Sequence, residues 1–283
     1  MTENYTVWEK QLEGSGSALV VAFEGWNDAG NASSWAARHL REDLNAELFA
    51  TILAEDFYDF STTRPLVHLA EDGRQLDWPE TKFSAATDQD ILLLEGIEPH
   101  LQWRSFVEEI TSVVTRLEVS MVITLGSLLT EVPHSRPVMV YGFCEDDETS
   151  SRLNLQKSMY EGPTGIIGVL NQAIQEQNIP AVSLWATVPN YVSGATSPKA
   201  ALALIERLNE ILPSPATTTE LEIACAAYER QINELIENDE DMSAYVMDLE
   251  YRYDQGEFEA DPASGFGDRV ERWLHDGASP DET

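Results

Sequence analysis

Apolar, β-branched runs recur through residues 18–212, and segments with helical periodicity lie between several of them. The runs cover residues 18–23, 48–53, 91–94, 121–125, 138–143 and 182–186, and the helical segments cover 31–44, 101–117, 164–177 and 198–212. Within 101–117, apolar residues return every three or four positions, as on the buried face of a helix. This alternation predicts an α/β fold in which a mostly parallel sheet lies between layers of helices.

The pattern changes at residues 212–216, where two prolines stand close together. Proline ends a helix and stiffens a connection, so we expect an α/β domain over 1–215 and a helical extension over 216–283. Two apolar stripes at helical spacing, separated by a turn at 237–239, predict a pair of helices in this extension. Residues 217–283 contain 19 acidic and 4 basic residues. These acidic side chains form either a solvated helix face or a docking surface for a basic partner.

The whole chain is strongly acidic, with 50 Asp and Glu residues against 17 Lys and Arg residues and a formal net charge of −33. Such a surface repels the phosphates that nucleic-acid-binding proteins neutralise, so we expect no nucleic-acid partner. No apolar run is long enough to span a bilayer, and residues 1–10 lack a secretory-signal pattern. We therefore expect a cytoplasmic protein with no membrane partner. Cys144 and Cys225 lack metal-ligand spacing and are expected to be free thiols.

Common catalytic and cofactor signatures do not occur in the sequence. It contains no nucleophile elbow (G-x-S-x-G), no P-loop (G-x-x-x-x-G-K-[ST]) and no dinucleotide-binding G-x-G-x-x-G. Neither H-E-x-x-H nor C-x-x-C is present, and the five histidines are scattered. We therefore expect no cofactor and no metal site, and we assign no catalytic residue.

The connection richest in chemistry follows the apolar run 18–23. In an open α/β sheet, ligands usually bind beyond the carboxyl ends of the strands. Two carboxylates, an amide and an indole make this turn a candidate site for a ligand or partner, formed by Glu24, Trp26, Asn27, Asp28 and Gly30. The competing interpretation is an ordinary βα turn, in which a side chain such as Asp28 binds the free amides at the start of the next helix.

A second candidate loop follows the run 121–125. We expect Gly126 and Ser127 at a turn, with His134 and Arg136 held between two prolines. One interpretation is a nucleophile–base pair formed by Ser127 and His134. The other is that Ser127 caps a short helix and Arg136 pairs with one of the many carboxylates.

A third candidate loop contains Glu161 and Gly162 and leads into the helical segment 164–177. The start of this helix is either an anion site, which Glu161 would oppose, or an ordinary helix initiation by proline and threonine. We expect all three loops to meet at one rim of the sheet.

Four blocks of sequence together resemble the proteasome assembly chaperone 2 family. They are EGWNDAG, GSLLTEVPHSRPVMVYG, YEGPTG and SLWATVPNYVSGATSPKAALALIERL, and they follow one another within residues 18–212. The resemblance is to an actinobacterial branch that carries an acidic, helical C-terminal extension. It implies a three-layer, phosphorylase/hydrolase-like fold, in which a mixed sheet is flanked by helices.

The resemblance also implies a non-catalytic, assembly-chaperone-like protein that binds protein partners and forms a homo-oligomer, with a trimer as one expected form. Archaeal relatives bind proteasome core particles through a C-terminal tail of a hydrophobic residue, a tyrosine and any residue. The sequence given ends Asp281-Glu282-Thr283, so we do not expect that mode of binding to a proteasome-related client. The residues themselves leave a second hypothesis open: a small-molecule binder or enzyme with a nucleoside- or amine-like ligand in a crevice at the strand ends.

Overall fold

The computed structural model describes residues 5–13, 17–70, 73–213 and 216–257. Its strands are β1 (Thr6–Trp8), β2 (Ala18–Glu24), β3 (Glu47–Ile52), β4 (Leu66–Ala70), β5 (Gly73–Asp77), β6 (Thr81–Ala86), β7 (Ile91–Ile97), β8 (Met121–Thr130), β9 (Val140–Cys144) and β10 (Ala181–Pro189). Its α-helices are α1 (Ala32–Asp43), α2 (Trp103–Arg116), α3 (Asp147–Leu153), α4 (Ile166–Glu176), α5 (Pro198–Ile211), α6 (Thr219–Glu237) and α7 (Glu240–Asp254).

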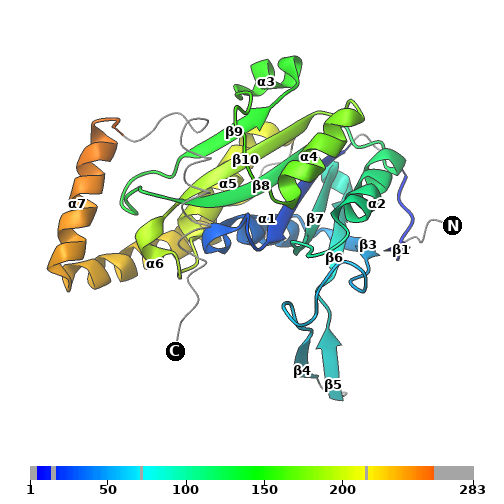
Figure 1. Ribbon diagram of the computed structural model, residues 1–283, viewed down its shortest axis with the longest axis horizontal. Helices are drawn as coiled ribbons and strands as arrows, with labels where there is room; N and C mark the ends of the chain where they lie inside the picture. Colours follow the sequence, from blue (N-terminus) through cyan, green and yellow to red (C-terminus); the bar gives the residue numbers. More distant parts are fainter. Residues whose placement is uncertain (1–4, 14–16, 71–72, 214–215, 258–283) are drawn as a thin grey trace.

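Eight of the strands form one mixed sheet in the order β1-β3-β6-β7-β2-β8-β10-β9 (Figure 1). The central strands β7, β2, β8 and β10 are parallel, whereas the strands toward both edges pair antiparallel. This arrangement places the carboxyl ends of the four central strands at one edge of the sheet. The mixed sheet flanked by helices that the family resemblance implies is confirmed. The mostly parallel sheet expected from the alternation of strands and helices is wrong, because four of the seven pairings between the described strands of this sheet are antiparallel.

Helices cover the two faces of the sheet, and each face has its own hydrophobic core. Residues of α1 and α5 pack with alternate residues of the central strands on one face. Residues of α2 and α4 pack with the other set of strand residues on the opposite face. Six of the seven residues of β2 are buried, because helices lie on both sides of it. An uninterrupted apolar run is typical of such a strand.

Some elements differ from the prediction. Gly126 and Ser127 do not lie at a turn but inside β8, which continues to Thr130. Ser127 therefore does not cap a helix. The strand continues because all of residues 122–130 pair with β10, which also extends over nine residues. Strands β1, β4, β5 and β6 and the short helix α3 were not predicted, because they are short, exposed or polar.

The β4–β5 hairpin lies outside the main sheet and projects away from the body of the molecule (Figure 1). Helices α6 and α7 lie at the other end, with α6 packed on α5 and α7 following after the turn at 238–239. The predicted pair of C-terminal helices is thus present. Residues 258–283, including the C-terminal tail, lie outside the described residues. In the described part of the chain, no helix has both the length and the apolar character required to cross a bilayer.

Candidate functional site

The turn after β2 returns to the sheet instead of leaving it. The backbone N–H of Ser127 in β8 donates to the carbonyl of Asn27 at 2.9 Å, and Asp28 and Ser127 form an isolated parallel bridge. The chain thus leaves β2 at Gly25 and rejoins β8 at Asn27. Trp26 lies on the resulting bulge, at the carboxyl ends of the paired strands β2 and β7.

Asp28 holds the start of α1. Its Oδ1 accepts from the backbone N–H of Ser33 at 2.8 Å, from the hydroxyl of Ser33 at 2.7 Å and from the N–H of Ser34 at 3.2 Å. The capping interpretation is therefore correct for this oxygen. The other oxygen, Oδ2, is buried and has no hydrogen-bond partner. The carboxylate thus keeps one acceptor that the fold does not use.

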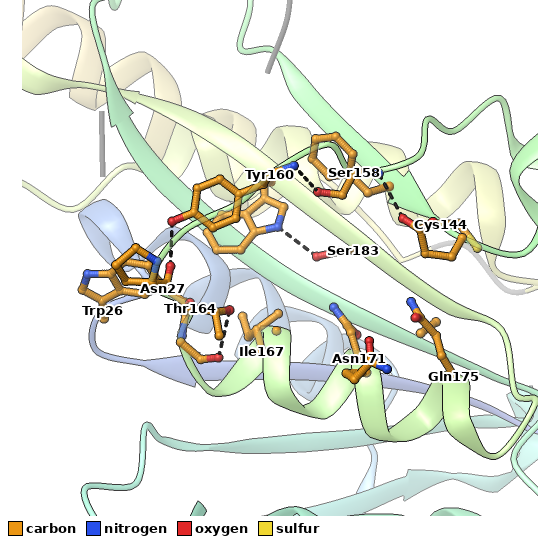
Figure 2. Close-up of a pocket in the computed structure, with 18 residues that line it drawn as sticks. Trp26, Asn27, Cys144, Ser158, Tyr160, Thr164, Ile167, Asn171, Gln175 and Ser183 are labelled. Carbon is orange, nitrogen blue, oxygen red and sulfur yellow. Dashed lines mark hydrogen bonds between the residues drawn. The ribbon is translucent and has the colours of Figure 1, made fainter. Parts of the chain in front are cut away.

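Two cavities lie on either side of this turn. The first, of about 610 Å³, lies between α4, β9, β10 and the segment before α4 (Figure 2). The second, of about 380 Å³, lies between the β2 turn, β8 and residues 193–196. Trp26 and Trp185 line both cavities, so the two indoles form a shared wall. Together the cavities provide the volume typical of small-molecule sites.

Two glycines make room for these indoles. Trp185 pairs directly with Gly126 across β10 and β8, and a Cβ at position 126 would lie 2.6–2.8 Å from the Trp185 ring. A Cβ at Gly165 would lie 2.8 Å from the ring of Trp26 and 2.6 Å from Oδ1 of Asn27. Each tryptophan ring therefore lies against the backbone of a glycine, and a larger residue in place of that glycine would clash with the ring.

A polar row lines the floor of the first cavity. Asn171 of α4 donates from Nδ2 to the hydroxyl of Thr124 at 3.1 Å, and this hydroxyl lies 3.1 Å from that of Ser183. The indole N–H of Trp185 donates to the same Ser183 hydroxyl at 2.8 Å. Figure 2 shows Asn171 and Gln175 on one side of α4, on the side of the helix toward the cavity. The lining thus combines aromatic rings with amide and hydroxyl groups.

The start of α4, which one of the two interpretations made an anion site, binds a carboxylate of the protein itself. Oε1 of Glu98, the residue after β7, accepts from the N–H of Ile166 at 2.8 Å and from Nδ2 of Asn27 at 3.2 Å. A carboxylate at a helix N-terminus is electrostatically favourable, so this end of α4 is already satisfied. Glu98 also ties the β2 turn to α4.

His134 lies outside the two cavities and holds helix α6. Its Nδ1 lies 2.8 Å from the hydroxyl of Tyr191, and its Nε2 lies 3.0 Å from Oδ1 of Asn233 in α6. The Tyr191 hydroxyl also accepts from the His134 backbone N–H at 2.7 Å. Both ring nitrogens are therefore engaged, and no contact joins His134 to Ser127. Burial raises the pKa of Tyr191, so its hydroxyl stays protonated and can donate to the imidazole.

Arg136 binds helix α7. Its Nε and Nη2 donate to the two carboxylate oxygens of Asp254 at 2.8 and 2.7 Å, and its Nη1 lies 3.3 Å from Glu250. This bidentate pair lowers the pKa of Asp254 below its usual value and raises that of the guanidinium. The hydroxyl of Tyr253 adds a bond to the carbonyl of Pro137 at 3.0 Å. Arg136 thus pairs with carboxylates, as one of the two interpretations held.

The remaining candidates also lie apart from the cavities. Glu24 is exposed, and its Oε1 lies 3.6 Å from Nη2 of Arg38 in α1. Neither residue lines the two cavities. Glu161 and Gly162 are exposed and do not line either cavity. The structure therefore gathers the candidates Trp26, Asn27, Asp28, Gly30, Gly126 and Ser127 around the two cavities. It does not bring Glu24, His134, Arg136, Glu161 and Gly162 to the same place.

Several residues of the site were not predicted from the sequence, namely Trp185, Glu98, Ser183, Tyr160, Asn171 and Gln175. One signal in the sequence points to Trp185: it is the one aromatic residue in a strand that otherwise contains small and aliphatic residues. Among the described residues, no group of three or more His, Cys, Asp or Glu side chains could hold a metal ion.

Comparison with known proteins gives a consistent picture. A model described as the PAC2 family matches residues 22–236. The chain is 41% identical to a PAC2 family protein from Streptomyces avermitilis, with a TM-score of 0.75, over 81% of this chain and 99% of the other. It is 38% identical to a proteasome-assembly chaperone homologue from Mycobacterium tuberculosis, with a TM-score of 0.73 and the same coverage, 81% and 99%.

A third solved structure is similar over more of the chain. It is a Mycobacterium tuberculosis protein of unknown function, 28% identical with a TM-score of 0.82, and the match covers 95% of this chain and 96% of the other. All three similar proteins come from actinobacteria, as the sequence resemblance implied. Among proteins with curated functions, none matches this chain.

Proposed function

Because the chain belongs to the PAC2 family, we propose that it is a non-catalytic, assembly-chaperone-like protein of the cytoplasm that binds a protein partner. The similarity to a mycobacterial proteasome-assembly chaperone homologue supports this role. The observation that carries the proposal is the β4–β5 hairpin, which projects from the body of the molecule (Figure 1). Several of its large apolar residues are exposed.

The strand register sorts the hairpin side chains into two faces. Val67 pairs with Leu76, and Leu69 pairs with Arg74, so these four side chains lie on one face. Val67, Leu69 and Leu76 are 59%, 80% and 55% exposed. An isolated two-stranded hairpin is marginally stable in water, and contiguous exposed apolar groups mark interaction sites. We propose that this apolar hairpin face (Val67, Leu69 and Leu76) contacts the partner.

A catalytic role for the sequence candidates is disfavoured by their contacts. Both ring nitrogens of His134 are bonded, and Arg136 is paired with α7. The hydroxyl of Ser127 donates to the carbonyl of Ala29 at 2.8 Å. Each group thus stabilises the fold, which is consistent with a binding protein.

The proposal is tested by affinity capture from a lysate of the source organism with the full chain as bait. A Val67→Ser/Leu69→Ser variant removes the apolar hairpin face. Leu66→Ser is the matched control, because Leu66 is also exposed but lies on the opposite face. We expect the wild type and Leu66→Ser to enrich the same protein and the double variant to lose it. Proteasome subunits among the enriched proteins would identify the client. Capture of the same protein by the double variant would contradict the role of the hairpin.

We further propose that the protein is a homo-oligomer, with a trimer as the first form to test, and that 216–283 acts as a separate interaction extension. The support for oligomers is the family resemblance together with exposed aromatic surface such as Trp78. Light scattering over a range of concentrations measures the mass directly. A monomeric mass at every concentration would remove the oligomer from the proposal.

A further inference from the structure

The two cavities around Trp26 and Trp185 have a distinctive charge. Among the described residues that line them, none is lysine, arginine or histidine. Two carboxylates are present, Asp28 in the second cavity and Glu145 at the edge of the first. The whole chain adds a net charge of −33 around them. Phosphates and carboxylates would therefore enter a negative field with no cationic partner, and the site selects against anions.

Asp28 offers an acceptor that the fold leaves unused. Its side chain is 5% exposed, Oδ1 already receives three hydrogen bonds from α1, and Oδ2 receives none. A buried polar atom without a partner is unusual in a native protein and is costly in a low dielectric. A hydrogen-bond donor or a positive charge in the adjacent cavity would remove this cost.

The indoles supply the second element of the site. Trp26 and Trp185 line both cavities, and the glycines at 165 and 126 fix the positions of their rings. An indole face attracts a cation through its quadrupole more strongly than the rings of tyrosine or phenylalanine do, and several aromatic rings around one cavity are typical of sites for alkylammonium groups. Tyr160 and Phe143 extend this aromatic wall in the first cavity.

We infer that the paired cavities bind an organic cation whose alkylammonium group lies against Trp26 and Trp185, with Asp28 as its counter-charge. An alkylammonium group reaches such a site either on a small molecule or as a lysine side chain of a protein. The inference is independent of the apolar hairpin face, which lies outside both cavities.

The test is isothermal titration calorimetry on the full chain with two pairs of probes. Choline is compared with 3,3-dimethylbutan-1-ol, which has the same shape without the charge. A capped pentapeptide with a central lysine is compared with the same peptide carrying norleucine. We expect at least one cationic probe to bind at least tenfold more tightly than its neutral counterpart. Binding of choline alone assigns the site to a small molecule, and binding of the peptide alone assigns it to a protein side chain.

Variants separate this site from general attraction to an acidic protein. Asp28→Asn and Trp185→Phe should each weaken the binding of the cationic probe at least fivefold. Glu161→Gln is the matched control, because Glu161 is exposed nearby but lines neither cavity. The inference would be overturned if the neutral probes bound as tightly as the cationic ones, or if Glu161→Gln weakened the cationic probe as much as Asp28→Asn and Trp185→Phe do. It would also be overturned if neither cationic probe bound at 10 mM. The Val67→Ser/Leu69→Ser variant should bind the probe normally even if it loses its protein partner.

Discussion

The ring of Trp185 lies directly over the backbone of Gly126, its partner across β10 and β8. This contact explains why a glycine stands in the middle of a mostly buried strand, where it is intrinsically unfavourable. The glycine lets the indole lie against the sheet, and the indole then forms the wall between two cavities. Packing inside the sheet thus sets the shape of the candidate site.

Gly126→Ala should destabilise the protein because the new methyl group would lie 2.6 Å from the Trp185 ring. Overpacking of this kind costs about 1–3 kcal/mol, so we expect a lower free energy of unfolding and a changed tryptophan fluorescence. Gly194→Ala is the control: its Cβ meets no atom within 4 Å, although Gly194 also lines the second cavity. Urea denaturation of both variants measures the difference, and equal stabilities would contradict the proposed role of Gly126.

Glu98→Ala should loosen the junction between the β2 turn and α4. The carboxylate accepts from Ile166 N–H and from Asn27, and its loss leaves both donors without that partner. Unsatisfied buried donors cost about 1–3 kcal/mol, so the thermal midpoint should fall by several degrees. Glu161→Ala, an exposed acid in the neighbouring loop, should change stability by less than about 0.5 kcal/mol. A midpoint for Glu98→Ala equal to that of the wild type would show that another group replaces the carboxylate.

The sequence pattern predicts the central sheet well because its strands are buried on both faces. The runs at the start of β2 and β7 are apolar without interruption, as is typical of strands buried on both faces. The β4–β5 hairpin has no such signal. Every residue of β5 is exposed and the strand is mostly polar, so neither alternation nor apolarity marks it. The hairpin forms through the pairing of β4 with β5, two exposed strands, and the residue pattern of β5 does not indicate that pairing.

The candidate site is only partly predictable for a different reason. Trp26, Asn27 and Asp28 follow a clear strand, so their place at a strand end can be read from the sequence. Trp185 joins them only because β10 pairs with β8 in a register that places it on Gly126, and local sequence does not give that register. His134 and Arg136 also follow β8, but their partners lie about a hundred residues later, in α6 and α7.

The pairing of Arg136 with Asp254 should make the docking of α7 sensitive to acid. The pKa of Asp254 is lowered in the folded state, chiefly by its hydrogen bonds from Arg136. Its contribution to stability is therefore present above its ordinary value of about 3.9 and is lost as the pH falls through the lower folded value. Carboxyl-carbon NMR of Asp254 in a pH titration measures this directly. In Arg136→Gln we expect the pKa to return to its ordinary range; an unchanged value would mean that the pair does not form in solution.

Cys225 should react slowly with thiol reagents. Burial, above all, raises its pKa to about 11, so at pH 8 its thiolate fraction is roughly a hundredfold below that of a free cysteine. A Cys144→Ser variant isolates this thiol, since these are the two cysteines of the chain. Alkylation by iodoacetamide should be slow at pH 8, and its rate should still rise between pH 10 and 11, where the rate for a free thiol of ordinary pKa has levelled off. A rate that levels off by about pH 10 would show instead that the thiol is exposed and has an ordinary pKa.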